Sequence, residues 1–401
     1  MESPGWQSNS VAEWMLLEGW KIQSPVESLA AMSNKFRAAG VPIDRMRLTV
    51  RLLHPQVNGV SFTWSSDNGE VVVNDLTHEM VGSNDMYKRS PFYPLFEQNA
   101  GAIRCRITHE EAPVDYPVLL ELKDQGYTDY VALPLDFSDG RRSVITLSTK
   151  VEGGFTAQAL EVVSNTLPVL ARLVENVAMR RTASILLETY LGKRTGDEVL
   201  SGKVRRGDGH AIRAVLWFCD LRNSTPLAES MERDAYLELL NDYFDCMAKA
   251  ILDHDGEVLS YIGDAILAIF PLRQFDHTCP VCKASTRNAV GAAREALSQL
   301  SDLNMRRESS GKQTIGTGIG LHAGEVMYGN IGVPSRLDFT VIGPAANEAA
   351  RIEGLTKELK VPLVVSGDFT NLFPQEWSSL GTHSLRGVSQ DHALFTLPEF
   401  G

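Results

Sequence analysis

The order of apolar and polar positions divides the chain into two parts with different patterns. In the first part, two apolar runs flank the dipeptide Asp139-Gly140, a turn signal, and this arrangement predicts a β-hairpin. Other periodic segments predict a further strand and several short helices, so residues 1–155 are interpreted as one mixed domain. The predicted strands are 46–53, 130–135 and 143–148, and the predicted helices are 11–17, 28–38 and 117–124.

A longer helix is predicted to begin after Thr156, a good N-cap residue. Apolar residues recur over 160–177 at alternating spacings of three and four, which favours pairing with a second helix. The alternative is a helix that packs on its own domain, and Pro168 is expected to kink or restart it. The polar, glycine-rich stretch 191–209 predicts a linker. Residues 156–211 are therefore interpreted as a signalling helix and linker.

From residue 212 onward, the predicted order is strand, helix, strand, strand, helix, strand. This order is typical of a ferredoxin-like α+β core, in which an antiparallel sheet carries helices on one face. Strand-like segments are expected at 317–322, 326–330 and 338–342, and Gly343-Pro344 begins one more helix. Residues 212–401 are expected to form a second domain.

Two aspartates in this second part stand at the ends of apolar strands. Asp220 closes the apolar run 214–219, and Asp264 follows Gly263 in a predicted type II′ turn. A lone carboxylate there is costly, whereas two brought together make a site for hard cations. Asn347 and Arg351 stand four apart and share a helix face. Metal-binding carboxylates, an amide and a guanidinium together suit chemistry on phosphates. Taken singly, a Gly-Asp dipeptide is commonly only a turn, and Asn347 with Arg351 is commonly only a solvated helix face.

Composition narrows the classes of function. With 401 residues the chain should hold two or three domains. With a formal charge of −12, it lacks the basic face that a general nucleic-acid binder needs. A small anionic substrate remains compatible, because metal ions and local cations can invert the field. No apolar stretch reaches ~18 residues, and the N-terminus has no signal core, so no transmembrane segment and a cytoplasmic location are expected. The odd number of cysteines, five, favours reduced thiols.

Four segments of the second part stand in a characteristic order: 218–225 (FCDLRNST), 262–264 (IGD), 336–351 (RLDFTVIGPAANEAAR) and 384–388 (SLRGV). Together they make residues 213–397 resemble the catalytic domain of class III nucleotidyl cyclases, the adenylate and guanylate cyclases. One segment alone would be a weak match. The four in order are specific.

The resemblance implies the conversion of ATP to 3′,5′-cyclic AMP and pyrophosphate. It assigns two divalent ions, Mg²⁺ or Mn²⁺, to Asp220, Asp264 and the backbone carbonyl of Leu221. It also implies that Arg351 meets charge on the α-phosphoryl oxygens, as expected of transition-state stabilisation. By the same resemblance, Asn347 orients the ribose. The terminal phosphates are expected to contact Arg386.

In this family the site lies between two catalytic domains packed head to tail. One chain here carries both sets of residues, so the resemblance implies a homodimer. The expected base pocket is irregular, with Ser260 where adenylate cyclases usually carry Lys and Thr340 where they carry Asp or Thr. Guanylate cyclases usually carry Glu and Cys at these places. We therefore predict ATP as the substrate, with a guanylate cyclase or a degenerate nucleotide-binding signalling homodimer as alternatives.

The first part of the chain resembles a GAF-like sensor domain on three short segments: 133–135, Asp139-Gly140 and 154–156. The resemblance implies an unknown small-molecule or protein regulator. In the second part, Cys279 and Cys282 stand near His277, which suggests a zinc or redox site. These are only three ligands, however, and a loop that leads into a helix is the simpler interpretation.

Overall fold

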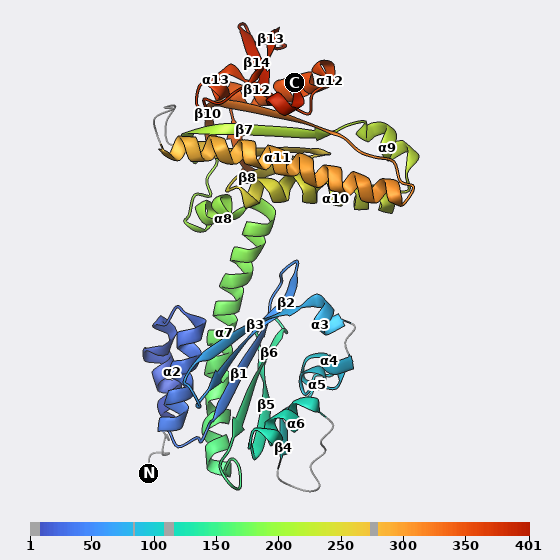
Figure 1. Ribbon diagram of the computed structural model, residues 1–401. Helices are drawn as coiled ribbons and strands as arrows, with labels where there is room; N and C mark the ends of the chain where they lie inside the picture. The colour runs from blue at the N-terminus through green and yellow to red at the C-terminus, as the bar shows by residue number, and fades with distance from the viewer. Residues whose placement is uncertain (1–8, 83–84, 108–115, 273–279) are drawn as a thin grey trace. The chain divides into compact units, whose positions relative to one another are not determined.

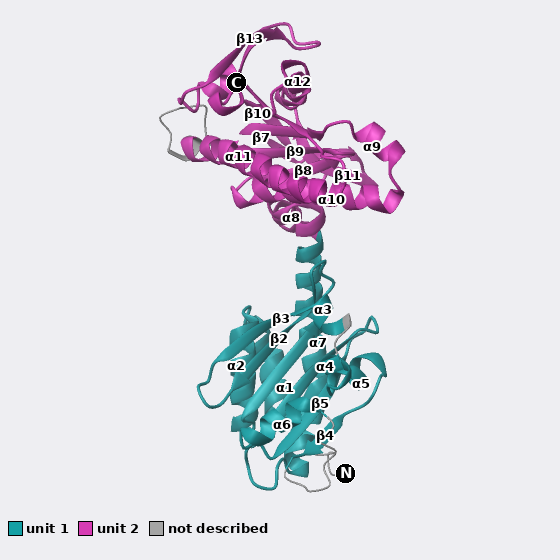
Figure 2. Cartoon of the chain, turned by 45° about the vertical axis from the view of Figure 1, so that its right-hand side comes forward, with its two compact units in different colours: residues 1–186 teal, residues 187–401 magenta. Residues whose placement is uncertain are grey.

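The computed structural model describes residues 9–82, 85–107, 116–272 and 280–401. The chain divides into two compact units, Met1–Leu186 and Leu187–Gly401 (Figure 2). Both units combine helices with a β-sheet, so the fold class is α+β, as the sequence predicted. In the part of the chain that the structure describes, no helix is both long and apolar enough to cross a membrane.

The first unit is built on a six-stranded antiparallel sheet with the strand order β3-β2-β1-β6-β5-β4 (Figure 1). The predicted hairpin is confirmed: β5 and β6 pair from Asp129 with Thr149 to Asp136 with Arg142. Gly140 in its turn has φ +83°, which favours glycine. The strands are β1 (Arg45–Arg51), β2 (Val57–Ser65), β3 (Val71–Thr77), β4 (Ile103–Arg106), β5 (Asp129–Asp136) and β6 (Arg142–Thr149).

Helices pack on both faces of this sheet because side chains alternate along each strand. Val131 and Leu133 of β5 point into a core shared with α1, α2 and α7, and Tyr130 and Ala132 point into a core shared with α5 and α6. The helices are α1 (Ser10–Leu17), α2 (Pro25–Ala38), α3 (His78–Gly82), α4 (Asp85–Lys88), α5 (Phe92–Glu97), α6 (Pro117–Asp124) and α7 (Ala157–Leu191), with a 3₁₀ turn η1 (Gly19–Lys21).

The predicted long helix, α7, is present, but the favoured account of its apolar seam was wrong. The Thr156 hydroxyl accepts a hydrogen bond from the Ala159 N–H at 3.1 Å, so Thr156 is the expected cap. The seam residues Val163, Leu170 and Val174 are buried in the core of their own unit. A helix on a sheet and a paired helix show the same three-and-four spacing, so the spacing does not distinguish them. The helix also continues through Pro168 without restarting.

The second unit contains the predicted ferredoxin-like core. Its four strands lie in the order β10-β7-β9-β8, and helices α10 and α11 pack on one face (Figure 1). Further elements extend the sheet to eight strands: β13-β14-β12 continue it beyond β10, and β11 pairs with β10. The strands are β7 (Gly209–Leu221), β8 (Glu257–Ile262), β9 (Ala265–Leu272), β10 (Thr317–Val333), β11 (Arg336–Ile342), β12 (Leu363–Ser366), β13 (Ser378–Ser384) and β14 (Asp391–Thr396).

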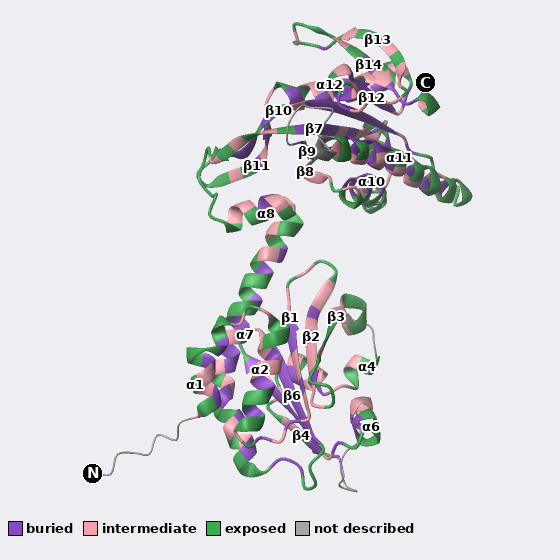
Figure 3. Ribbon diagram, turned by 60° about the vertical axis from the view of Figure 1, so that its left-hand side comes forward, coloured by how far each residue is buried: buried purple, intermediate pink, exposed green. Residues whose placement is uncertain are grey.

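Helix α12 packs on the face of the sheet opposite α10 and α11, against Ala214 and Leu216 of β7. Strand β7 is consequently buried on both faces, which explains its continuous apolar run (Figure 3). The helices of this unit are α8 (Lys193–Leu200), α9 (Ser224–Ser230), α10 (Arg233–Asp253), α11 (Pro280–Ser309), α12 (Pro344–Leu359) and α13 (Gly367–Thr370), with a terminal 3₁₀ turn η2 (Pro398–Phe400).

Two predicted boundaries in this unit were wrong. The segments 317–322 and 326–330 are one strand, β10, because Gly324 does not break it: a Cβ there would lie 2.2 Å from the Ala345 Cβ of α12, so the glycine allows close helix packing. The expected linker 191–209 contains helix α8. Thr195 of α8 is buried, and its hydroxyl lies 2.8 Å from the Tyr328 hydroxyl of β10.

Candidate active site

Asp220 and Asp264 lie together at one end of the central strands of the second unit. Asp220 pairs in register with Ala265 across β7 and β9, and Asp264 occupies the turn immediately before Ala265. Gly263, the first residue of that turn, has φ +65°, as a turn with glycine first requires. The backbone therefore brings the two carboxyl groups close enough for Asp264 to raise the pKa of Asp220.

The electrostatics of this pair favour a bound cation. Burial and, after it, the neighbouring Asp264 together raise the pKa of Asp220 to about 6, against the lowering effect of Arg222. The Asp264 Oδ2 atom is buried and has no hydrogen-bond partner among the described residues. No third His, Cys, Asp or Glu completes a cation cluster with them in the described ranges. Two carboxylates fit Mg²⁺, which is commonly held by one or two carboxylates together with substrate phosphates.

A buried ion pair behind the aspartates was not predicted from the sequence. Arg222, two residues after Asp220, lies 3.2 Å from Glu353 of α12, which is only 5% exposed. Burial, with smaller contributions from Asp220 and Asp264, raises the pKa of Glu353 to about 7, although Arg222 acts to lower it. The pair therefore connects the aspartate end of the sheet to α12.

In the sequence, two alternating glycines of β10 are the feature that could have indicated this ion pair. A Cβ at Gly318 would lie 1.9 Å from Arg222 Nη2 and 2.3 Å from Glu353 Oε1, and a Cβ at Gly320 would lie 2.6 Å from the Glu353 backbone nitrogen. Because side chains alternate along a strand, Gly318 and Gly320 open one continuous channel on the face that α12 covers. The Gly-x-Gly spacing thus marks where the ion pair lies.

Asn347 and Arg351 lie on α12, and Asn347 is exposed. Arg351 lies beside the loop after β13: a Cβ on Gly387 would be 3.7 Å from Arg351 Nη1. The exposed Arg386 is the residue immediately before that glycine. The structure therefore places two predicted phosphate-binding cations next to the same short loop.

Within one chain, the two sets of predicted residues face different ways. Glu353 points from α12 toward Arg222 and the aspartates. Arg351 stands two positions earlier, and residues two apart on a helix do not share a face. The described chain therefore brings the aspartates together but leaves Arg351 elsewhere.

Ser260 and Thr340, predicted to contact the base, lie half-buried on β8 and β11, two strands that contact each other. Leu221, predicted to offer its carbonyl, is the buried last residue of β7. His277 and Cys279 lie outside the described residues, and the side chain of Cys282 is likewise not described. The suggested zinc or redox site therefore stays an untested alternative.

Comparison with known proteins identifies the second unit. Residues 211–390 match the family model of the adenylate and guanylate cyclase catalytic domain. The match includes the aspartate pair, α12 and the loop with Arg386. The chain thus contains a catalytic domain of the class III adenylate and guanylate cyclase family. The family description names both nucleotides, so membership alone does not choose between them.

Individual relatives match over the same part of the chain. An adenylate cyclase of Anabaena cylindrica is 39% identical over 161 residues, which are 40% of this chain and 30% of that protein. Adenylate cyclase 1 of Rhizobium meliloti is 30% identical over 41% of this chain and 25% of that protein. A solved bacterial light-regulated adenylyl cyclase is similar over 58% of this chain and 64% of that chain, with 24% identity and a TM-score of 0.46. The chain thus matches less than a third of the length of these two curated relatives.

Proposed function

We propose that the protein is an adenylate cyclase that converts ATP to 3′,5′-cyclic AMP and pyrophosphate. The observation that carries this proposal is the facing pair Asp220 and Asp264, with its orphaned buried oxygen, inside a cyclase-family domain. In the reaction a bond forms between the ribose 3′-oxygen and the α-phosphorus. The bond from the α-phosphorus to the oxygen that leaves with pyrophosphate breaks, and the hydroxyl proton passes to solvent.

Asp220, Asp264 and the Leu221 carbonyl are the proposed ligands of two Mg²⁺ or Mn²⁺ ions. When bound, such ions activate the attacking oxygen and neutralise charge on the leaving group. The facing carboxylates supply the negative charge that draws the ions to the end of β7. Because the described residues place only these two acidic side chains together there, the remaining ligand positions are left for phosphate oxygens and water.

The cationic side chains of α12 and of the neighbouring loop are proposed to bind the phosphates of the nucleotide. Arg351 meets the charge that builds on the α-phosphoryl oxygens, where a guanidinium can donate two parallel hydrogen bonds. Arg386 binds the terminal phosphates, and its position next to Gly387 places it near Arg351. Asn347, one turn before Arg351, orients the ribose.

The opposite directions of Glu353 and Arg351 support a site shared by two copies of the chain. We propose a head-to-tail homodimer in which one copy supplies the aspartates and its partner supplies Arg351. Large apolar side chains remain exposed on β8, β10 and β11, among them Tyr261 at 55%, Ile262 at 53% and Met327 at 49%. Such a surface is typical of a protein interface.

The test of this function is a direct identification of product. The purified chain, incubated with Mg²⁺ or Mn²⁺ and ATP or GTP, is expected to yield 3′,5′-cyclic AMP from ATP, identified by mass spectrometry. Cyclic GMP as the main product would favour the guanylate cyclase alternative. Nucleotide binding without any cyclic product would favour the degenerate signalling homodimer.

The choice of ATP rests on Thr340, whose hydroxyl can accept a hydrogen bond from the adenine amino group. Ser260 is too short to replace the usual Lys directly, although a water molecule can bridge. Ser260→Lys is therefore expected to raise the ATP-over-GTP ratio of kcat/KM by about tenfold, one direct polar contact. Rates with both nucleotides measure it, and Ser379→Lys on β13 serves as a control. An unchanged ratio would remove Ser260 from the base pocket.

Metal binding is expected to depend on pH through Asp220. Since the pKa of its carboxyl is raised to about 6, the group is protonated below that pH and must lose its proton to bind an ion. Mn²⁺ affinity, measured by electron paramagnetic resonance without nucleotide, should fall by up to ~10-fold per pH unit below 6. Asp220→Asn should flatten the profile. Equal affinities at pH 7.5 and 5 in the unsubstituted protein would contradict this role.

The first unit is proposed to be a GAF-like domain that regulates the cyclase. Helix α7 supports this proposal, because it packs in the core of the first unit and continues to Leu191, past the boundary at Leu186 and Leu187. A small molecule or a protein that binds the first unit would thereby act on a helix that leads into the second.

A further inference from the structure

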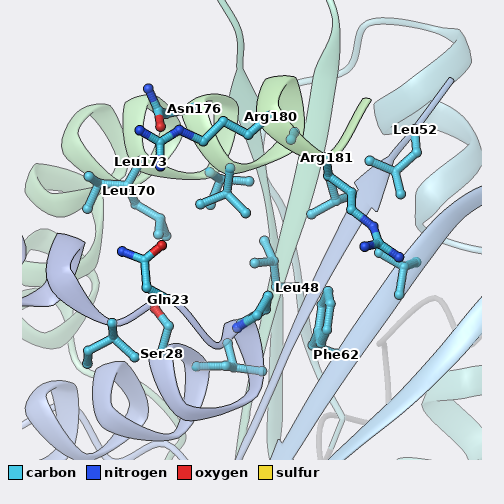
Figure 4. Close-up of a pocket in the computed structure, with 18 of the residues that line it drawn as sticks. Gln23, Ser28, Leu48, Leu52, Phe62, Leu170, Leu173, Asn176, Arg180 and Arg181 are labelled. Atoms are coloured by element: carbon cyan, nitrogen blue, oxygen red, sulfur yellow. The ribbon is translucent and has the colours of Figure 1, made fainter. Parts of the chain in front are cut away.

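The first unit contains a cavity of about 950 Å³ between its sheet and its helices. The floor is the face formed by β1, β2 and β3, and the walls come from α1, α2 and α7 (Figure 4). Helices α5 and α6 cover the other face of the sheet and take no part in it. A cavity of this volume is at the upper end of the range of small-molecule sites.

The interior of the cavity is apolar and elongated. Leu48, Leu52 and Phe62 line the floor and remain only half-buried, so their side chains keep apolar surface that no protein group covers. Alternate residues from Leu48 to Leu52 extend the floor over ~13 Å of β1. The facing wall of α7 runs from Leu170 to Arg181, a rise of ~16 Å. Such a shape fits an extended hydrocarbon body, whose burial would be favourable.

Positive charge gathers at one wall of the cavity. The charged residues among its described lining are Arg172, Arg180 and Arg181 of α7 and Asp75 of β3. Arg172 is already engaged, at 2.8 Å from Glu175. The side chains of Arg180 and Arg181 have no hydrogen-bond or ion-pair partner among the described residues. Figure 4 shows Arg181 extending from α7 toward Leu52, whereas Arg180 extends back along α7 toward Asn176.

A histidine adds a donor to the same lining. The His54 Nδ1 atom accepts hydrogen bonds from the backbone N–H groups of Gln56 at 3.0 Å and Val57 at 3.3 Å. With Nδ1 an acceptor, the neutral ring carries its hydrogen on Nε2. The lining therefore offers two free guanidinium groups and an imidazole N–H against the single carboxylate of Asp75.

We propose that this cavity binds a free amphiphile with an extended apolar body and one anionic head, of the class of a medium- or long-chain carboxylate. The apolar body lies on Leu48, Leu52 and Phe62, and the carboxylate meets Arg181, which can bind it through paired N–H groups. Arg180 adds a second positive charge to the same wall. The residues that line the cavity all belong to the first unit, so binding there does not depend on the proposed cyclase function.

Dodecanoate, below its critical micelle concentration, is the probe for the full-length protein. Calorimetric titration should show saturable binding, and tryptophan fluorescence should change because Trp14 and Trp20 line the cavity. Dodecanol, which has the same body without the charge, should bind at least ~10-fold more weakly, since charge-assisted hydrogen bonds are the stronger ones. Dodecylamine should bind more weakly still.

Substitutions separate the head contact from the body contact. The double variant Arg180→Gln and Arg181→Gln should weaken dodecanoate binding at least ~10-fold and leave dodecanol binding unchanged. Arg89→Gln, an exposed arginine outside the lining, is the matched control. Val60→Trp should fill the cavity and abolish binding of both probes, with thermal unfolding used to confirm the fold.

Three outcomes would overturn the proposal. Tighter binding of dodecylamine than of dodecanoate would make Asp75 the head contact. Equal binding of dodecanol and dodecanoate, or no saturable binding of either, would refute an anionic amphiphile. A third outcome combines two results: the unsubstituted protein binds neither probe, and Val60→Trp has a lower mass in sedimentation than the unsubstituted protein. Together they would show that a second copy of the chain occupies the cavity.

Discussion

Replacing Asp264 with asparagine is expected to lower cyclase turnover by at least ~1,000-fold, about 4 kcal/mol of transition-state stabilisation. Asparagine keeps the shape of the side chain but removes half of the paired negative charge that would hold two divalent ions. The measurement is initial-rate formation of cyclic AMP at saturating Mn²⁺. Asp242→Asn, an exposed aspartate of α10, is the control and should retain normal activity.

The stability of the same variant separates a metal role from a structural one. Asp264 lies against Asp220 and has an orphaned buried oxygen, so its charge opposes the metal-free fold. Thermal unfolding without metal should therefore occur at an equal or higher temperature in Asp264→Asn. A clear loss of stability together with near-normal turnover would contradict the proposed metal site.

The chemistry of the candidate site could be predicted where strong local signals coincide. Asp220 follows an apolar run and Asp264 follows a glycine, so each was expected at a strand end, and the register of β7 with β9 brings both ends together. The Arg222–Glu353 pair could not be predicted in this way, because its partners are 131 positions apart and meet only when α12 packs on β10. Contacts of that kind depend on packing across a sheet, and periodicity does not report packing.

In the fold, too, the features set by local sequence were predicted, and the features set by tertiary packing were not. Turn chemistry predicted the β5–β6 hairpin, and element order predicted the ferredoxin-like core. The apolar seam of α7 was assigned to the wrong partner because its spacing fits a sheet as well as a helix. The prediction of a break in β10 was wrong because Gly324 makes room for Ala345 of α12. Only the folded structure shows that this close packing requires a glycine.

Replacing Arg351 with alanine is expected to lower kcat by at least ~100-fold with little change in KM or in unfolding temperature. Its proposed contact is with charge present only in the transition state, so substrate binding should survive its loss. Steady-state kinetics and thermal unfolding measure the two parts of this prediction. Lys357→Ala, on the last turn of the same helix, is the control. A variant with raised KM and normal kcat would instead make Arg351 a ground-state binding residue.

The two inactive variants together test whether the site is shared between chains. In a head-to-tail dimer that pairs Asp264→Asn with Arg351→Ala, one site receives both substitutions and the other receives neither. Random mixing makes half of the dimers mixed, so about a quarter of all sites are intact, and the mixture should regain about a quarter of normal activity. Since Glu353 and Arg351 point from α12 in different directions, this recovery is the expected result. A mixture that stays inactive while native mass spectrometry shows mixed dimers would place the whole site within a single chain.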